Sequence, residues 1–247
     1  MKYNDIFWVG TCDVSNRGRQ YVEGLLLNRG RGNCSRFAKT VRKSTSQSLQ
    51  NFITDSPWDE RKVIERLQRD IAELIGDPVE GSIHIDETGF PKQGTHSVGV
   101  RRQYCSRLGK VDNCQVGVFL GYVNGSRRTL IDGQLYLPEE WANNNMLRNK
   151  CKVPKDVRFR TKAEIGLDMV LNARKNGVPF GRVGMDWFYG EQSHLRKKLD
   201  EEGLVYIADI PRDTRVWIKM PEIGIPERNG DRIPSRKRVL DGEPEPI

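Results

Sequence analysis

Hydrophobic residues in the first eighty positions recur at helical spacing, which predicts an N-terminal part made of helices and turns. The pattern predicts one helix over residues 17–28 and a second through residues 49–53. The first helix is predicted to place four residues on one face, Tyr21, Val22, Leu25 and Leu26. We expect this small module either to contact DNA or to brace the next domain.

The third helix of this part has the clearest predicted boundaries. Ser56 is predicted to cap its N-terminus, with Pro57 in the first turn, and Gly76 to cap its C-terminus. Its predicted buried face consists of Val63, Ile64, Leu67, Ile71, Leu74 and Ile75. Directly after this helix, at Asp77 and Pro78, the spacing changes to period two, which favours a domain boundary there.

The rest of the chain alternates between strand and helix patterns. Three successive strands are predicted at residues 82–86, 97–105 and 114–123. A helix, a fourth strand, a second helix and a fifth strand follow, at residues 162–176, 181–186, 191–202 and 204–210. The helices are predicted to turn inward Ile165, Met169, Val170 and Ala173, and then Leu195 and Leu199. A meander followed by alternating helix and strand predicts an α/β fold with a mixed sheet and flanking helices.

Three domains follow from these patterns. Residues 1–78 form the helical module, residues 79–210 the α/β domain, and residues 211–247 a loop, linker or inserted segment. The last of these holds five prolines after Pro211 and few hydrophobic residues in any period, so no helix or strand is predicted there.

Composition limits the class of protein. Hydrophobic residues make up 36% of the 247 residues, and no stretch approaches eighteen apolar residues, which excludes a membrane-spanning helix. The N-terminus does not have the pattern of a signal peptide, so a soluble cytosolic protein is expected. Five cysteines, none two to four residues from another, predict reduced thiols and no zinc site.

The net charge of +8 favours a polyanionic partner, and its distribution favours nucleic acid. Residues 17–43 hold eight basic residues and one acid, residues 101–128 six and one, and residues 148–162 seven and one. Each stretch taken alone is equally well explained as a solvated surface, but the three together fit phosphate contacts better. The residues predicted to bind DNA are Arg101, Arg102, Lys110, Arg127, Arg128, Lys150, Lys152 and Lys155.

Two acids are placed where they can carry chemistry. Asp86 and Asp186 each end an apolar predicted strand, and an acid there lies where a cation can reach it. A solvated turn acid is the alternative interpretation of each. If the two strands are neighbours, the carboxylates converge and can bind Mg²⁺ or Mn²⁺ for phosphodiester chemistry. His84 is expected on the strand face of Asp86, packing or bracing and not binding metal.

Several motifs around these acids resemble the DDE transposases of bacterial insertion sequences. The resemblance extends over residues 17–247. Its most specific segments are residues 86–94 (DETGFPKQG), 96–100 (HSVGV), 136–138 (YLP) with Trp141, Asp186 with Tyr189 and Gly190, and residues 213–217 (DTRVW).

This resemblance implies an RNase H-like catalytic domain in which Asp86 and Asp186 are the first two catalytic metal ligands, with Mg²⁺ or Mn²⁺ as cofactor. It implies hydrolysis at transposon ends and strand transfer into target DNA, in a bacterial cytoplasm and at the nucleoid when bound to DNA. It implies no membrane and is compatible with a homodimer on DNA.

The family's third metal ligand is a glutamate on a helix beyond an inserted β-rich segment, and we expect this chain to end within that segment, with its activity incomplete. Replacement of that ligand by a local acid is the alternative, with Glu87, Glu191 and Asp209 as candidates. Two other functions remain open. One is a metal-dependent RNase H-like nuclease without strand transfer, and the other is a truncated, end-binding fragment that inhibits the full protein.

Overall fold

A computed structural model describes residues 2–211, 213–225, 238–239 and 244–246 of the chain. The chain divides into two compact units between Gly181 and Arg182. The domain boundaries drawn from the sequence at residues 78 and 210 divide the chain by expected function, and they remain predictions.

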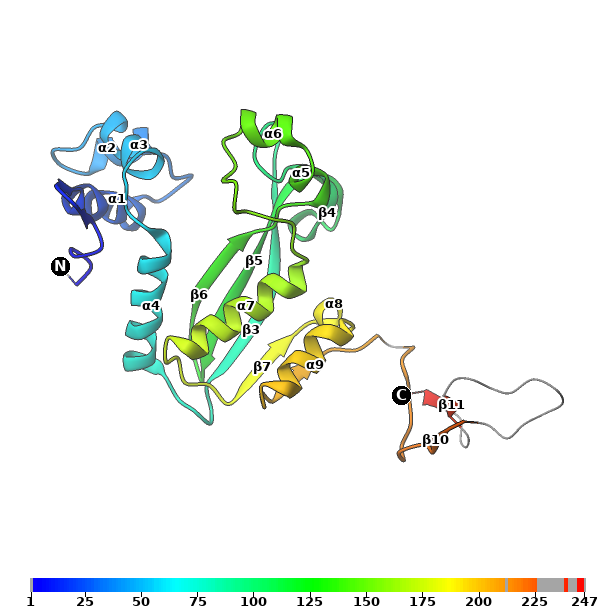
Figure 1. Cartoon of the computed structure of the whole chain (residues 1–247). Coiled ribbons are helices and arrows are strands. Elements are labelled where there is room, and N and C mark those ends of the chain that lie inside the picture. The colour runs from blue at the N-terminus through cyan, green and yellow to red at the C-terminus, as the bar shows by residue number, and fades with distance from the viewer. Residues whose placement is uncertain (1, 212, 226–237, 240–243, 247) are drawn as a thin grey trace. The chain divides into compact units, whose positions relative to one another are not determined.

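The first unit begins with a three-helix module (Figure 1). Its elements are a hairpin of β1 (Trp8–Val9) and β2 (Cys12–Asp13), then α1 (Ser15–Leu27), α2 (Cys34–Thr40) and α3 (Ser46–Thr54). Helices α1, α2 and α3 pack around the buried side chains of Phe37, Leu49 and Phe52. Helices α1 and α3 confirm the two helices predicted in this region. Helix α2 and the hairpin were not predicted, because they have too few residues to show a hydrophobic period in the sequence.

The buried face of α1 differs from the predicted one. Leu26 is 81% exposed, and Val22 and Leu25 are also exposed, while only Tyr21 of the predicted face is half-buried. Glycines decide the packing, because a Cβ at Gly24 would lie 2.7 Å from the Phe37 side chain. The helix turns its smallest residues inward so that aromatic rings can approach its backbone.

Helix α4 (Glu60–Ile75) begins three residues later than predicted. Asp59, and not Ser56, caps it by accepting a hydrogen bond from the backbone N–H of Arg61 at 2.8 Å. Trp58 stacks on Phe52 with ring centroids 5.3 Å apart and donates to the Phe52 carbonyl, which keeps the preceding segment outside the helix.

The predicted hydrophobic face of α4 is also less buried than expected. Leu74 is exposed and the other five predicted residues are half-buried. The most buried side chain of the helix is Gln68, which donates to the carbonyl of Ile131 and accepts from Asn176. Helix and sheet are joined here by a polar contact that hydrophobic spacing does not reveal.

The sheet of the first unit is antiparallel. Its strands are β3 (Ser82–Pro91), β4 (Arg101–Cys105), β5 (Lys110–Asn124) and β6 (Arg127–Leu135), with the short helix η1 (Ser106–Leu108) before β5. The long strand β5 pairs with β4 over its first five residues, with β3 over residues 114–123 and with β6 over residues 117–124. The three predicted strands are present and antiparallel, but their predicted consecutive pairing as a meander is wrong, because β5 lies between β4 and β3 and pairs with both. Strand β6 was not predicted.

Helix α7 (Lys162–Lys175) packs against this sheet (Figure 1). Its predicted inward residues are all buried, and Gly177 follows it with φ +84°, so this helix is confirmed in position and orientation. A Cβ at Gly166 would lie 2.7 Å from Ile85 of β3, so the glycine allows close packing. The short helices α5 (Glu139–Ala142) and α6 (Asn145–Lys150) lie between β6 and α7.

The second unit holds β7 (Arg182–Met185), α8 (Trp187–Gly190), α9 (Ser193–Glu201) and β8 (Tyr206–Ala208). Strands β7 and β8 are parallel, and Leu195 and Leu199 of α9 are buried as predicted. Antiparallel and parallel pairing in one chain, with helices between the strands, confirms the mixed α/β class, and the RNase H-like assignment stays what the resemblance implies.

The segment after Pro211 contains short strand pairs where none was predicted. Strands β9 (Arg215–Val216) and β12 (Glu245–Pro246) form one ladder, and β10 (Ile223–Gly224) and β11 (Arg238–Val239) form another. Two-residue strands are too short to show alternation in a sequence. No helix in the described part of the chain is both long and apolar enough to cross a membrane.

Candidate active site

Asp86 lies in the middle of β3 and not at its end. The strand continues to Pro91, and Asp86 pairs with Phe119 of β5. The sequence suggested an end because the hydrophobic run stops at this residue. The run stops because Glu87 follows the buried Ile83 and Ile85 on the inner face, while His84 and Asp86 of the other face are exposed and the ladder itself continues.

The carboxylate of Asp86 is exposed on the sheet face opposite to the one that α7 covers. Ile83 and Ile85 alternate with it and are buried, and Ile85 contacts α7 at Gly166. Asp86 lines an open pocket of about 340 Å³ together with His84, Thr88, Phe90, Phe119, Gly121 and Leu130. His84 therefore shares a face with Asp86 as predicted, and its Nε2 lies 2.9 Å from the hydroxyl of Ser82.

Glu87 points to the other face of β3. Its Oε1 accepts a hydrogen bond from Nζ of Lys162 at 2.7 Å, and both side chains are less than one fifth exposed. Nζ of Lys162 also lies 5.8 Å from the ring centroid of Tyr136, a half-buried phenol whose pKa is raised by desolvation. Since successive residues of a strand face opposite sides, Glu87 is poorly placed to share a metal ion with Asp86.

Asp186 directly follows β7, as predicted. It caps α8, because its Oδ1 accepts a hydrogen bond from the backbone N–H of Tyr189 at 3.2 Å. In the parallel pair Met185 is the partner of Ala208, so Asp186 and Asp209 are the next residues of adjacent strands. The backbone N–H of Asp209 donates to the carbonyl of Met185 at 3.2 Å. Two acids of the second unit thus follow the carboxyl ends of neighbouring strands.

The convergence of Asp86 and Asp186 remains a prediction, because the first belongs to one compact unit and the second to the other. Among the described residues, no three or more His, Cys, Asp or Glu side chains form a group that could hold a metal ion.

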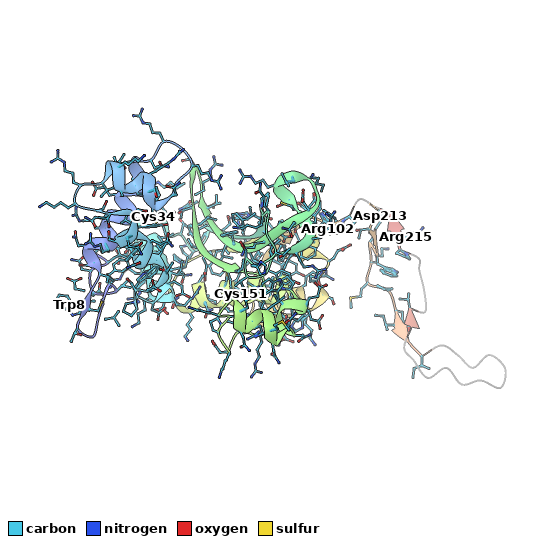
Figure 2. All side chains as sticks on the ribbon, turned by 90° about the horizontal axis from the view of Figure 1, so that it is seen from above. Trp8, Cys34, Arg102, Cys151, Asp213 and Arg215 are labelled. Atoms are coloured by element: carbon cyan, nitrogen blue, oxygen red, sulfur yellow. The ribbon has the colours of Figure 1, made fainter. Side chains whose placement is uncertain are left out.

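The residues predicted to bind DNA differ in how they are engaged. Arg101 pairs with Glu140 at 3.5 Å and Lys110 with Asp112 at 3.1 Å. Nζ of Lys150 lies 2.9 Å from Nε2 of His96, and Arg127 donates to the carbonyl of Leu74 at 3.4 Å. The other four have no ion pair within the described part of the chain, and these are Arg102 (Figure 2), Arg128, Lys152 and Lys155.

One of these four, Lys155, lies in a basic pocket. The pocket is open, measures about 630 Å³, and is also lined by Arg148 and Arg158. Arg148 is held in place because it donates to the carbonyls of Ala142 and Pro154. The predicted third basic stretch is therefore partly gathered at one concave surface.

The sequence did not predict the hydrophobic side chains that surround Asp86. Phe119 lies between two glycines, since a Cβ at Gly117 or at Gly133 would come within 2.8 Å of its ring. Leu130 and Gly133 belong to β6, so the missed strand hid one side of this surface. Asn124 and Gly125 before β6 were the available signal, because an Asn-Gly pair between hydrophobic runs favours a tight hairpin.

Known proteins are similar to this chain over most of its length. The model of the DDE superfamily endonuclease family matches residues 12–246. A probable transposase for insertion sequence element IS701 from Microchaete diplosiphon is 33% identical over 192 residues, which are 76% of this chain and 46% of that protein. The chain thus spans about half the length of this curated relative.

A solved structure was also matched, the Drosophila P element transposase strand transfer complex, with 10% identity over 75% of this chain and 40% of that chain. Its TM-score of 0.23 is too low to support an argument about fold. The match to the family model and the 33% identity to the curated relative show that the chain belongs to the DDE superfamily endonucleases.

Proposed function

We propose that this chain is the DNA-binding and metal-binding part of a transposase that hydrolyses the phosphodiester at transposon ends and joins the freed 3′-hydroxyl to target DNA. The observation that carries the proposal is the exposed carboxylate of Asp86, which lines an open pocket on the sheet face opposite to α7, in a chain of the DDE superfamily. Asp86 and Asp186 are the proposed metal ligands, and Mg²⁺ or Mn²⁺ is the proposed metal.

The residues present fit a hard divalent cation. Asp86 has no ion pair in the described part of the chain, and its Oδ1 is oriented by the backbone N–H of Glu87 at 2.7 Å. Oxygen ligands of this kind are what Mg²⁺ and Mn²⁺ prefer. When bound, the ion lowers the pKa of the attacking hydroxyl and stabilises the leaving oxygen. The protein holds the two carboxylates in position, and its basic side chains contact the DNA phosphates on either side of the bond that is cut.

Among the local acids, Asp209 is the one that the geometry favours as an additional ligand. It follows the strand next to that of Asp186, whereas Glu87 is engaged by Lys162 on the opposite face from Asp86. Glu191 follows α8 and is exposed. The expectation that the 247-residue chain is inactive by itself depends on whether such an acid completes the site.

Metal binding is the first test. We expect Mn²⁺ titration followed by electron paramagnetic resonance to show a site that Asp86→Asn and Asp186→Asn each weaken at least tenfold. The control Asp112→Asn removes an acid that pairs with Lys110 and should leave Mn²⁺ binding unchanged. Unchanged binding in both test variants would overturn the assignment of the metal site.

Catalysis is the second test. Purified protein is incubated with DNA carrying the element's end, with Mn²⁺ or Mg²⁺, and nicked and joined products are separated on a denaturing gel. Joining supports the transposase, and nicking alone supports a nuclease. DNA-end binding that survives Asp86→Asn without cleavage by either form supports an inhibitory fragment. Cleavage that Asp209→Asn abolishes would show that a local acid completes the site.

A further inference from the structure

The basic pocket lies among α5, α6 and the segment that connects α6 to α7, at one end of the sheet (Figure 1). Among the described residues, no Asp or Glu lines it, and none of its three cations, Arg148, Lys155 and Arg158, forms an ion pair. Asp156 follows Lys155 in the chain and is exposed, but it does not line the pocket. A concave surface with positive charge and no protein counter-ion favours an anionic ligand.

The lining of the pocket is fixed by a small hydrophobic core beneath it. Trp141 of α5 is 3% exposed and donates from Nε1 to the carbonyl of Val100 at 2.8 Å. Ala142 and Val153, two residues of the lining, pack against this core. The backbone N–H of Val153 donates to the carbonyl of Arg148 at 2.9 Å. The pocket is therefore preformed, and its volume of about 630 Å³ is usual for a ligand site.

Three carboxamides line the pocket beside the cations. Asn143, Asn145 and Asn149 are exposed, and within the described residues none of their side chains forms a hydrogen bond. Asn144 differs, because its side chain caps α6 by accepting from the backbone N–H of Leu147 at 3.0 Å. Each free carboxamide offers donors and an acceptor, which are the groups that bind the edge of a nucleobase.

An aromatic ring completes the lining. Phe159 is 37% exposed, and its ring centroid lies 6.5 Å from that of the half-buried Tyr136, with the two planes at 66°. The contact with Tyr136 orients the ring, while the exposed part of Phe159 is available to a ligand. An aromatic side chain next to cations is the combination that binds an unstacked base together with its phosphate.

We propose that the basic pocket binds one unpaired nucleotide of the DNA, with the base stacked on Phe159 and its edge bonded to the carboxamides. Arg148, Lys155 and Arg158 bind the phosphate. The nucleotide must be unpaired because the faces of a base inside a duplex are covered by its neighbours. This inference rests on the proposed function insofar as DNA is the substrate, and it adds a site for a single nucleotide outside the double helix.

The test compares three duplexes of one sequence, which carry an extra unpaired nucleotide, an abasic residue at the same place, or no insertion. Their affinity for the full 247-residue chain is measured by fluorescence anisotropy, with a chelator present to prevent cleavage. We expect the unpaired nucleotide to be bound about 5- to 150-fold more tightly than the abasic residue, the effect of stacking one base.

Substitutions at Phe159 connect this ratio to the pocket. Phe159→Leu should bring the ratio close to one, because the ring is lost, whereas Phe159→Tyr keeps a ring and should retain the ratio. Thermal unfolding checks that both proteins are folded. The control Trp8→Leu removes another exposed ring, from β1, and should leave the ratio unchanged.

A cation of the pocket should act differently from the ring. Arg158→Gln should weaken the binding of all three duplexes and reduce the slope of log affinity against log salt by about 0.9, because one phosphate contact is lost. The ratio between the unpaired nucleotide and the abasic residue should change little, since both insertions carry a phosphate.

Equal affinity for the unpaired nucleotide and the abasic residue would overturn this inference and leave the proposed function standing. A ratio that Phe159→Leu retains would do the same. Binding of free deoxyadenosine monophosphate, with equal affinity for all three duplexes, would show a site for small nucleotides and overturn the assignment to DNA. Absence of any DNA binding would overturn the proposed function together with this inference.

Discussion

A single buried acid ties the helical module to the sheet. Asp132 of β6 has a fully buried side chain, and both of its oxygens accept hydrogen bonds from Arg61 of α4, at 2.7 and 2.8 Å. The hydrogen bonds from Arg61 to Asp132 raise the pKa of Arg61, and they outweigh the opposite effect of desolvation. A carboxylate in this position is stable only because the guanidinium meets it in a planar, two-bond geometry.

Replacing Arg61 should therefore destabilise the protein. We expect Arg61→Ala to lower the free energy of unfolding by about 2–4 kcal/mol, somewhat less than for fully buried pairs because Arg61 is 39% exposed. Urea unfolding followed by circular dichroism measures the change. Arg61→Ala combined with Asp132→Asn should recover part of the loss, because the unpaired charge is then gone. A loss under 0.5 kcal/mol, roughly the effect of an ordinary surface substitution, would contradict this account.

The cysteines should react at very different rates. Burial and the neighbouring Cys105 raise the pKa of Cys114 to about 11, whereas Cys12 is exposed. The thiolate is the reactive form, so at pH 8 the raised pKa alone should slow alkylation of Cys114 by about 100-fold relative to an ordinary thiol. Iodoacetamide labelling with peptide mass spectrometry should show Cys12 modified first and Cys114 only on unfolding. Equal rates would contradict the burial.

The same shift has a consequence for stability. A raised thiol pKa means that folding favours the neutral form, so its contribution is complete below the ordinary pKa near 9 and is lost as the pH rises toward 11. The free energy of unfolding should fall over this interval, and Cys114→Ala should reduce the fall. Urea titrations at pH 8 and pH 10.5 compare the two proteins.

At the scale of single residues, the sequence singles out Asp86 and Asp186, whose role as metal ligands stays a prediction, but it does not predict their surroundings. Asp86 and Asp186 stand out because a hydrophobic run stops at each of them. The pairing of Glu87 with Lys162 joins residues 75 positions apart, and no local pattern encodes such a contact.

Among the elements, α7 depends on one glycine. Gly166 allows the helix to approach Ile85, the neighbour of Asp86 on β3, and an added Cβ would lie 2.7 Å from a branched side chain that has little room to move. We expect Gly166→Ala to lower the free energy of unfolding by about 1–3 kcal/mol, the usual cost of overpacking a core. The control Asn172→Ala, on the exposed side of the same helix, should be neutral or slightly stabilising. Thermal unfolding of both proteins provides the comparison, and a stabilised Gly166→Ala protein would show that the contact relaxes freely.

Elements were predictable where a period extended over several turns. Helix α7 was placed correctly because four buried residues recur at helical spacing within its fourteen residues. The start of α4 was placed wrongly, because Ser56 and Pro57 are residue types that favour a helix N-terminus. Trp58 instead stacks on Phe52, and the helix begins only at Glu60. Strand β6 was missed because it mixes exposed and buried residues around Asp132, so its alternation is broken by a buried charge.

For the whole molecule, the excess of positive charge should govern DNA affinity. Lys152 and Lys155 lack ion pairs in the described part of the chain, whereas Lys197 and Lys198 both lie within 4 Å of Glu201. Changing the first two to Gln should reduce the slope of log affinity against log salt by about 2, since each lost phosphate contact contributes about 0.9. Changing Lys197 and Lys198 to Gln removes the same charge and should alter the slope less. Fluorescence anisotropy with duplex DNA at several salt concentrations measures both, and equal slopes would remove the 152–155 segment from the DNA-binding surface.

Helix α4 is hydrogen-bonded to the sheet near its start, at its middle and at its end, so it is a rigid spacer of fixed length. Arg61 is bonded to Asp132 near its start, Gln68 to Ile131 at its middle, and the carbonyl of Ile75 to Asn124 at its end. Sixteen residues at about 1.5 Å each extend roughly 24 Å, or about seven base pairs of DNA. If the helical module and Asp86 contact one duplex, as the proposed function requires, the number of base pairs between the two contacts is therefore set by the protein and not by the DNA. One residue inserted into α4 would rotate the helices before it by about 100° relative to the sheet and turn them toward a different side of a bound duplex.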